Sequence, residues 1–242
     1  MNKQDFPGQK SIALLLDPDK SGGDSLLKIL EVAVSSKVDY IFAGGSLTFS
    51  NIDKLTDEIR KNCSIPIVLF PGNLLQLSLN ADKILLLSLI SGRNPELLIG
   101  NHVLAAPYLK EVREKLISVG YILVGCGNKT SVEYISQTEA IPSDKPEIAV
   151  ATALAGEMLG LKMIYLEGGS GASTHIPLNL IKAVSENINI PLAVGGGIKD
   201  GIAIKNIFAA GANLIVLGNG CEKNPDLLAE ACLVRDSLIA AR

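Results

Sequence analysis

The sequence has few of the residues that build zinc sites. It contains two histidines and four cysteines in 242 residues, and no two cysteines form a CxxC pair. A structural zinc site needs four such ligands at short spacings, so this distribution argues against one. The cysteines are Cys63, Cys126, Cys221 and Cys232.

Signals for secretion, membrane insertion and nucleic-acid binding are also missing. The first ten residues are polar and contain Pro7 and Gly8, unlike a signal peptide. No uninterrupted apolar run approaches the roughly 18 residues of a membrane span. The 22 basic and 25 acidic side chains are interleaved, which is typical of solvated helix faces. We therefore expect a cytoplasmic, reducing environment, no transmembrane segment and no nucleic-acid partner.

What the chain does contain is an alternation of short apolar runs and longer segments of helical spacing. The runs are continuously apolar, as expected for strands that are buried on both faces. We predict eight strands, at residues 12–16, 40–43, 67–70, 84–87, 122–124, 163–166, 192–194 and 214–217. Helices are predicted at residues 24–36, 51–62, 103–119, 146–159, 177–186, 199–209 and 225–240.

This alternation favours a closed (β/α)₈ barrel over a doubly wound sheet. The first strand of a doubly wound sheet normally leads into a glycine-rich dinucleotide turn. Here it leads into the acidic segment Asp17-Pro18-Asp19-Lys20. The length is also close to the roughly 250 residues of a typical barrel. We predict a single TIM-barrel domain over residues 1–242.

One unit of the predicted barrel is irregular. Only residues 71–83 separate the third and fourth strands, and they include Leu74, Leu75, Leu77 and Leu79. One interpretation is a short, leucine-rich helix that packs on the barrel. The other is a missing helix, which would leave a gap through which an apolar ligand reaches the core.

The last three predicted strands each lead into a glycine-rich turn. These turns contain residues 168–171, 195–197 and 218–220. Glycine lets the backbone approach an anion closely and point several N–H groups at it. Ser170 and Asn219 add side-chain donors, and a helix begins after the seventh strand. One such turn would only redirect the chain, but three in succession predict a phosphate site.

The first two strands end in oxygen-bearing side chains. Asp17 and Asp19 follow the first strand, and Ser46 follows the second. A carboxylate and a hydroxyl suit Mg²⁺, which shares its coordination with substrate phosphates. The alternative is that one of the aspartates caps the next helix. The two interpretations remain open on this evidence.

Two further titratable residues follow the sixth strand. Glu167 would face whatever the phosphate group carries, and a hydrogen bond to a substrate hydroxyl is its expected role. His175 is expected to cap a helix or lie on the surface rather than to act in catalysis.

Together these motifs resemble the geranylgeranylglyceryl phosphate synthases and their bacterial heptaprenyl relatives. The resemblance rests on residues 16–20 (LDPDK), 43–46 (AGGS), 165–171 (YLEGGSG), 194–197 (VGGG) and the pair Gly218-Asn219. It implies a Mg²⁺-dependent prenyltransferase that joins sn-glycerol 1-phosphate to a long-chain allylic diphosphate, with geranylgeranyl diphosphate as the leading candidate. The product would be the ether precursor of a lipid.

The resemblance also implies roles for individual residues. Asp17 and Ser46 would hold Mg²⁺ under the diphosphate, with Lys20 as a further cation. Glu167 would bind the glycerol hydroxyl, aim it at the prenyl carbon and accept its proton. The glycerol phosphate would be bound by Tyr165, Leu166, Glu167, Gly168, Gly169, Ser170, Gly171, Gly195, Gly196, Gly197, Gly218 and Asn219.

Three further expectations follow from the resemblance. Apolar side chains around Leu98, Ile99 and Tyr108 would line or end the groove for the prenyl tail. Leu15 stands where some family members have a basic residue, which removes one expected phosphate contact. The chain would form a homo-oligomer, a dimer or a hexamer, with transient membrane contact for its lipid product.

Two other classes of protein remain compatible with the glycine turns. One is another phosphate-binding barrel enzyme, an isomerase or synthase of the histidine, tryptophan or thiamine pathways. Such enzymes would need an acid–base pair or a Schiff-base lysine deep in the barrel, and no lysine lies within a buried predicted strand. The other is a barrel that binds a phosphorylated ligand or flavin mononucleotide without turning it over.

Overall fold

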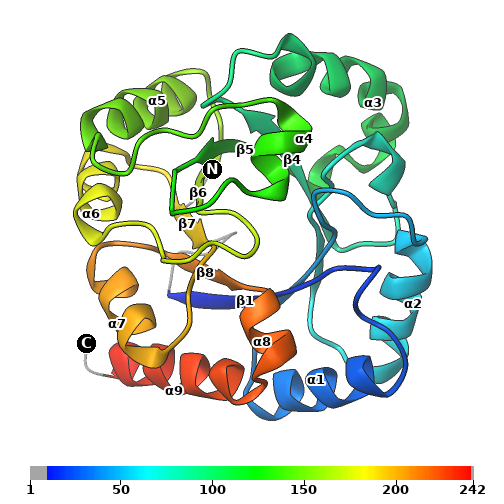
Figure 1. Cartoon of the computed structure of the whole chain (residues 1–242). Coiled ribbons are helices and arrows are strands. Elements are labelled where there is room, and N and C mark those ends of the chain that lie inside the picture. Colours follow the sequence, from blue (N-terminus) through cyan, green and yellow to red (C-terminus); the bar gives the residue numbers. More distant parts are fainter. Residues whose placement is uncertain (1–9, 241–242) are drawn as a thin grey trace.

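The structure is a computed structural model that describes residues 10–240, without the side chains of residues 222 and 223. Eight parallel strands close into a barrel in chain order, with β8 paired to β1 (Figure 1). The closed barrel confirms the predicted fold. The strands are β1 (Ser11–Leu16), β2 (Tyr40–Ala43), β3 (Ile67–Leu69), β4 (Lys83–Leu89), β5 (Leu116–Leu123), β6 (Met163–Glu167), β7 (Leu192–Gly195) and β8 (Leu214–Leu217).

Helices form a ring around the strands (Figure 1). The ring consists of α1 (Gly23–Ser35), α2 (Ile52–Asn62), α3 (Asn101–Leu109), α5 (Pro146–Met158), α6 (Leu178–Asn187), α7 (Gly201–Ala209) and α9 (Asp226–Ala240). The start of α2 shows how the sequence sets a boundary. The Asn51 side chain accepts the backbone N–H groups of Asp53 (2.7 Å) and Lys54 (3.3 Å), which satisfies two of the helix's unpaired donors. No described helix has the length and apolar character needed to cross a membrane.

Successive side chains of each strand point to opposite faces, so the core has one layer inside the barrel and one between the strands and the helices. On β6, Ile164 and Leu166 point outward and pack under the helices. Met163 and Tyr165 point into the barrel interior. There the Tyr165 ring lies 5.5 Å from that of Phe70 and 5.2 Å from that of Tyr121. These rings fill the interior, so the barrel is a packed core rather than a pore.

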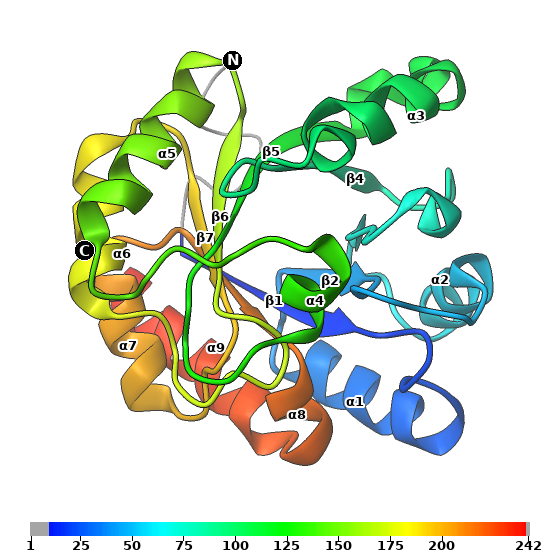
Figure 2. The ribbon, with the colours of Figure 1, turned by 45° about the horizontal axis from the view of Figure 1, so that its top comes forward.

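The third unit of the barrel lacks its helix. Within the described segment between β3 and β4, the only helical turn is the three-residue η1 (Leu74–Gln76), which lies between α2 and α3 (Figure 2). The two strands share only two residue pairs, Val68 with Lys83 and Leu69 with Ile84. This confirms the interpretation of a missing helix.

The predicted helix over residues 103–119 is wrong at its C-terminal end. The chain forms a π-helical turn η2 (Glu96–Gly100), then α3, then a 3₁₀ segment η3 (Lys110–Lys115). Residues 116–119, Leu-Ile-Ser-Val, already belong to β5 and pair with residues 84–87 of β4. An apolar run of this length suits either element, and pairing with a long neighbouring strand decides the outcome.

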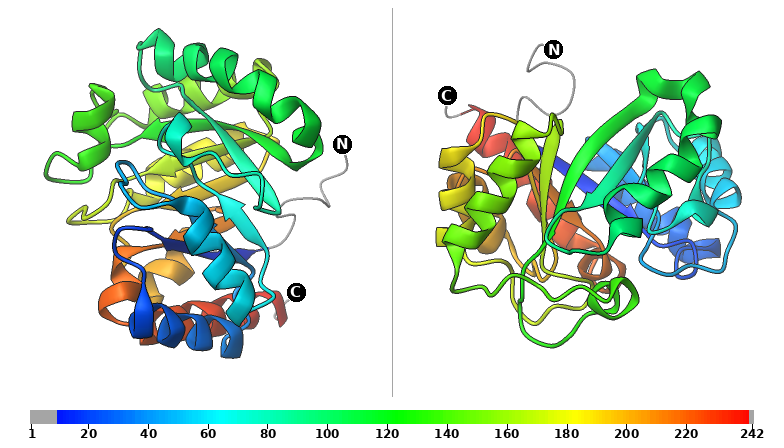
Figure 3. Two further views of the ribbon diagram at one scale, coloured as in Figure 1. Left: turned by 90° about the vertical axis from the view of Figure 1, so that its right-hand side faces the viewer. Right: turned by 90° about the horizontal axis from the view of Figure 1, so that it is seen from above.

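Two short helices were not predicted. Helix α4 (Ser131–Ser136) lies in the loop after β5, and α8 (Asn219–Lys223) follows β8. A capping box begins α4, because the Thr130 hydroxyl accepts the N–H of Glu133 while the Glu133 carboxylate accepts the N–H of Thr130. Figure 3 shows α4 at the end of the barrel opposite to the end where α9 stops. It therefore covers part of the mouth formed by the C-terminal ends of the strands.

Candidate active site at the barrel mouth

Glu167 ends β6 and is buried at the mouth, with 7% of its surface exposed. Its Oε1 accepts the backbone N–H of Gly169 at 2.6 Å. Burial raises the pKa of Glu167, and it outweighs the opposite effects of the Gly169 N–H and of the Tyr165 and Tyr121 hydroxyls. A carboxyl group with a raised pKa that faces a ligand site is suited to accept a proton.

Two tyrosines surround this carboxylate. Burial, together with the negative charge of Glu167, raises the pKa of both the Tyr121 and the Tyr165 hydroxyls well above the usual value. The Tyr165 hydroxyl is buried and makes no well-aligned hydrogen bond with any described residue. A Cβ at Gly195 would overlap this hydroxyl and lie 3.2 Å from Glu167 Oε2. The buried Tyr165 hydroxyl therefore lies next to the Glu167 carboxylate.

The turns after β6 and β7 form a cradle of backbone N–H groups. Their glycines Gly169, Gly171, Gly196 and Gly197 have φ values of 96°, 79°, 88° and 68°, which favour glycine. Among the residues that the structure describes, no acceptor is bound by the N–H groups of Ser170, Gly171, Gly196 and Gly197. Backbone N–H groups without an acceptor, in turns of this kind, are candidate donors to an anion.

The structure gives other partners to three of the predicted phosphate-binding residues. Gly168 donates its N–H to the Gly195 carbonyl at 2.9 Å, and Gly169 donates to Glu167. The Leu166 side chain is fully buried between β6 and the helices, and it points away from the barrel interior. The N–H groups of Gly168 and Gly169 therefore hold the turns in shape and are not free to bind a ligand.

A row of polar side chains crosses the mouth. Asn219 donates from Nδ2 to the Ser170 hydroxyl at 2.7 Å, and its Oδ1 lies 3.4 Å from Lys20 Nζ. The Lys20 ammonium also pairs with Asp17 Oδ2 at 3.2 Å. At Gly218 the neighbour is apolar, because a Cβ there would lie 3.7 Å from the Leu15 side chain. The phosphate corner and the Asp17 side of the mouth are thus one continuous polar surface.

The two aspartates of the first turn point to different places. The Asp17 carboxylate lies against the turn that carries Ser46, since a Cβ at Gly45 would be 3.3 Å from it. Asp19 instead accepts the backbone N–H groups of Phe49 (2.9 Å) and Ser50 (2.7 Å). Hydrogen bonds from Ser50 and Phe49 lower the pKa of Asp19. Asp19 therefore anchors the loop after β2, while Asp17, which is partly buried, pairs with Lys20 beside the turn of Ser46.

Asp17 and Ser46 offer oxygen ligands that fit Mg²⁺. No group of three His, Cys, Asp or Glu side chains within residues 10–240 is close enough to hold a metal ion. Mg²⁺ does not need such a group, because it commonly keeps several waters and takes further ligands from substrate phosphates. The donor set fits an ion that is completed by a bound diphosphate.

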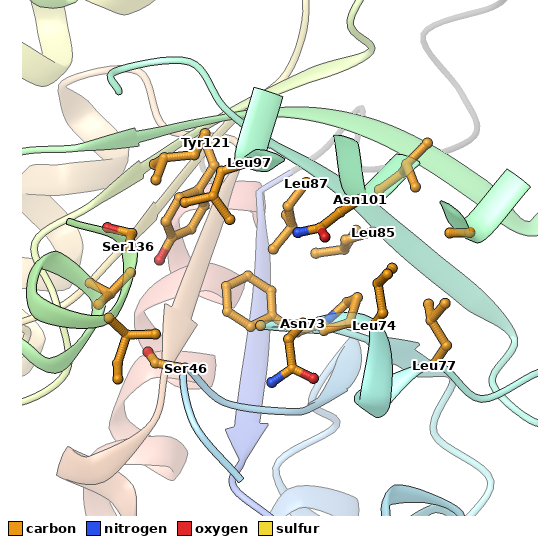
Figure 4. Close-up of a pocket in the computed structure, with 18 of the residues that line it drawn as sticks. Ser46, Asn73, Leu74, Leu77, Leu85, Leu87, Leu97, Asn101, Tyr121 and Ser136 are labelled. Atoms are coloured by element: carbon orange, nitrogen blue, oxygen red, sulfur yellow. The ribbon is translucent and has the colours of Figure 1, made fainter. Parts of the chain in front are cut away.

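An apolar pocket opens beside this part of the mouth (Figure 4). Ser46 lies at one side of it and Tyr121 at another, and leucines from η1 and β4 form much of the wall. It occupies the place left by the missing third helix. Its apolar lining includes Phe70, Leu74, Leu77, Leu85, Leu87 and Leu97.

The prenyl groove was predicted around three residues of the following helical segment, Leu98, Ile99 and Tyr108. Ile99 and Tyr108 are 59% and 74% exposed, and neither they nor Leu98 line the pocket. The residues that do so from this segment are Leu97, Asn101, His102 and Ala105. Burial lowers the pKa of His102. Leu98 and Ile99 lie in the π-helical turn η2. His175, in the loop after β6, has its Nδ1 2.8 Å from the Ile176 carbonyl oxygen.

Comparison with known proteins identifies the family. The sequence model of the PcrB family matches residues 8–234. The chain belongs to the PcrB family. Among its relatives in this family, the protein named geranylgeranylglyceryl phosphate synthase from Spirosoma linguale is 47% identical over 231 residues, covering 95% of this chain and 93% of the relative. The protein of the same name from Korarchaeum cryptofilum is 37% identical, covering 94% and 93%.

Solved structures agree with this assignment. The crystal structure of (S)-3-O-geranylgeranylglyceryl phosphate synthase from Thermoplasma acidophilum, in complex with its substrate sn-glycerol-1-phosphate, is 28% identical and has a TM-score of 0.90. The match covers 97% of this chain and 96% of that one. Thiamine phosphate pyrophosphorylase from Pyrococcus furiosus has a TM-score of 0.58 at 13% identity, which shows a shared fold alone. The expected family resemblance is thereby confirmed.

Proposed function

We propose that this chain is a prenyltransferase that forms an ether bond between sn-glycerol 1-phosphate and a long-chain allylic diphosphate, with geranylgeranyl diphosphate as the leading candidate. The names of its PcrB-family relatives and the glycerol phosphate bound by the Thermoplasma acidophilum enzyme support this activity. The observation that carries it is the position of Glu167. Its carboxylate lies beside the phosphate corner, and it also faces Tyr121, which lines the apolar pocket.

Glycerol phosphate binds at the turns after β6 to β8. The N–H groups of Ser170, Gly171, Gly196 and Gly197 hold the phosphate, and the Ser170–Asn219 pair lies at its edge. A hydroxyl of the glycerol then lies against Glu167, with the Tyr165 hydroxyl as a second partner.

The reaction is a substitution at the first prenyl carbon. A lone pair of the glycerol hydroxyl oxygen forms the new C–O bond, and the bond from that carbon to the diphosphate oxygen breaks. The diphosphate leaves with the bonding electrons, and Glu167 accepts the hydroxyl proton. Much of the rate enhancement comes from holding the two substrates in line, with the prenyl tail in the leucine-lined pocket.

The diphosphate binds at the Asp17 side of the mouth. Asp17 and Ser46 would hold Mg²⁺, which supplies charge neutralisation for the leaving group when it is bound. Lys20, between Asp17 and Asn219, adds a positive charge that either substrate can approach. The barrel interior excludes water from the reacting carbon with the rings of Phe70, Tyr121 and Tyr165.

Two further properties belong to this proposal. The chain acts in the cytoplasm as a homo-oligomer, a dimer or a hexamer, and it contacts a membrane transiently when the lipid product leaves. Exposed apolar side chains close to the pocket support such a contact; Leu75 on η1, for example, is 94% exposed.

The two alternative classes have less support. Among the described residues no lysine is buried, so a Schiff base deep in the barrel has no candidate. The decisive test is incubation of the protein with Mg²⁺, glycerol phosphate and a labelled prenyl diphosphate. We expect labelled ether product from sn-glycerol 1-phosphate and little from the opposite enantiomer. A series of prenyl lengths in the same assay identifies the preferred tail, and absence of product with every length would refute the proposal. A yellow purified protein would instead point to bound flavin.

A further inference from the structure

Gln76 is a buried polar residue at the end of η1, next to the pocket-lining residues Leu74 and Leu77. Only 2% of its surface is exposed. Its Nε2 donates to the Gly45 carbonyl at 2.8 Å, and its Oε1 accepts the N–H groups of Gly45 (3.3 Å) and Gly72 (3.1 Å). The side-chain amide is thus bonded on both its ends to the backbone of the turns after β2 and β3.

These two turns pack directly on each other. A Cβ at Gly72 would lie 3.0 Å from the Ser46 carbonyl oxygen and would overlap the Gly45 carbonyl. Gly44, with φ of 150°, similarly approaches the Phe70 carbonyl. At such close approach no side chain can enter between the turns. Gln76 reaches them from the side and satisfies backbone groups that are partly removed from water.

The same turn carries one of the groups assigned to the diphosphate. Ser46 follows Gly45, and the Asp17 carboxylate lies against Gly45 from the opposite side. Gly45, Ser46 and Gly72 also line the pocket (Figure 4). The distance from the Ser46 hydroxyl to Asp17, and to the entrance of the pocket, therefore depends on where this turn is held.

We propose that Gln76 is a positioning residue for the diphosphate half of the site. It holds the turn of residues 44–46 so that Ser46 lies beside Asp17 at the entrance of the pocket. The inference rests on the proposed function, because it is that function that assigns a diphosphate and Mg²⁺ to Asp17 and Ser46. Gln76 itself touches no substrate.

The chemistry of an amide suits this role. Glutamine is of the right length here and carries both a donor and an acceptor, so one side chain satisfies a carbonyl and two N–H groups. A leucine would leave all three groups without a partner. A glutamate would keep the two accepted bonds but lose the donated one, and it would add a negative charge near the diphosphate.

The test compares Gln76→Leu and Gln76→Glu with the wild-type protein. Calorimetry measures the binding of inorganic pyrophosphate with Mg²⁺, and separately the binding of sn-glycerol 1-phosphate without Mg²⁺. In Gln76→Leu we expect pyrophosphate affinity to fall by about 10- to 100-fold, because a displacement of Ser46 by about 1 Å has an effect of this size. The KM for the prenyl diphosphate should rise in parallel. Glycerol phosphate affinity should stay within about twofold, because its cradle is formed by other turns.

Ser78→Ala is the matched control. Ser78 is also buried, only two residues away, but its hydroxyl bonds to Asp53 on α2 and not to the turn. It should lower the unfolding temperature without changing pyrophosphate affinity. Gln76→Glu keeps two of the three bonds and covers the case in which Gln76→Leu does not fold; its loss of pyrophosphate affinity should exceed its loss of glycerol phosphate affinity.

Two results would overturn the inference. One is a folded Gln76→Leu protein with wild-type pyrophosphate affinity. The other is an equal loss of both ligands, which would indicate general destabilisation. Failure of the proposed function gives a different pattern, since the wild-type protein itself would then form no ether product.

Discussion

The Lys20 ammonium lies 3.4 Å from the side-chain oxygen of Asn219, although 199 positions separate the two residues. The same ammonium lies 3.2 Å from Asp17 Oδ2. Because Asn219 bonds Ser170 at the phosphate corner, Lys20 connects the two halves of the proposed site. In the proposed reaction, a single cation would therefore lie between the two phosphate-bearing substrates.

Removal of this cation should impair both substrates. We expect Lys20→Met to raise the KM of the glycerol phosphate and of the prenyl diphosphate by about 10- to 100-fold, from the loss of a charged hydrogen bond worth about 1.5–3 kcal/mol. The unfolding temperature should hardly change, since exposed ion pairs contribute little to stability. Lys28→Met, at an exposed position on α1, is the control. An effect on neither KM would contradict the role of Lys20.

Replacement of Glu167 by glutamine tests the general base. The amide oxygen can still accept the Gly169 N–H, so the turn keeps its shape, but it cannot take the hydroxyl proton. We expect Glu167→Gln to lower kcat by about 10²- to 10⁴-fold, the usual contribution of acid–base catalysis. Calorimetry should show nearly unchanged binding of glycerol phosphate. Full turnover in this variant would exclude proton transfer to Glu167.

The pH dependence of the reaction follows from the same carboxylate. Burial raises the Glu167 pKa, and the ionised form is the active base, so kcat should fall as the pH drops through this raised pKa. The Tyr121 hydroxyl lowers the pKa of Glu167. Tyr121→Phe should therefore move the acidic limb of the pH–rate profile to higher pH.

Tyr40→Phe is a matched control for this shift, because Tyr40 begins β2 at the opposite end of the barrel. Its acidic limb should coincide with that of the wild type. A shift to lower pH in Tyr121→Phe would refute the assignment.

The raised pKa of Glu167 also affects folding stability. A raised pKa in the folded state favours the protonated form, so the contribution of Glu167 to the free energy of unfolding is largest below its unfolded pKa. It is lost as the pH rises through the folded pKa.

The sequence predicted those parts of the molecule that depend on local chemistry. Apolar runs located all eight strands, and the glycine turns located the mouth, because both follow from short segments. The start of β5 was misplaced, since the structure of residues 116–119 is decided by pairing with β4. The groove was expected around Leu98, Ile99 and Tyr108 from the family resemblance alone, and which side chains of this segment reach the pocket depends on how η2 and α3 pack in the folded barrel.

Some functional contacts had no sequence signal that could reveal them. The glycines after β6 predicted a phosphate cradle, yet which N–H groups remain available depends on Gly195 and Glu167, through bonds formed only in the folded barrel. Gln76 lies in a leucine-rich, apolar segment. Its partner Gly45 is 31 positions away, and its nearer partner Gly72 belongs to no motif that would indicate the contact. A single glutamine among leucines in a shortened unit is the only hint.

The end of the barrel opposite the mouth provides a test of stability without an effect on chemistry. Arg235 on α9 is 4% exposed and donates to Asp39 Oδ2 (2.5 Å) and to the Lys37 carbonyl (2.9 Å). The same Asp39 oxygen accepts the N–H of Ile12 at the start of β1. Arg235→Met should lower the free energy of unfolding in urea by about 1.5–3 kcal/mol, because it leaves these acceptors without their charged donor. Arg60→Met breaks an exposed pair with Asp82 and should cost less than about 1 kcal/mol. Equal losses in the two variants would contradict the greater importance of the buried pair, and kcat should be unchanged in both because the mouth lies at the other end.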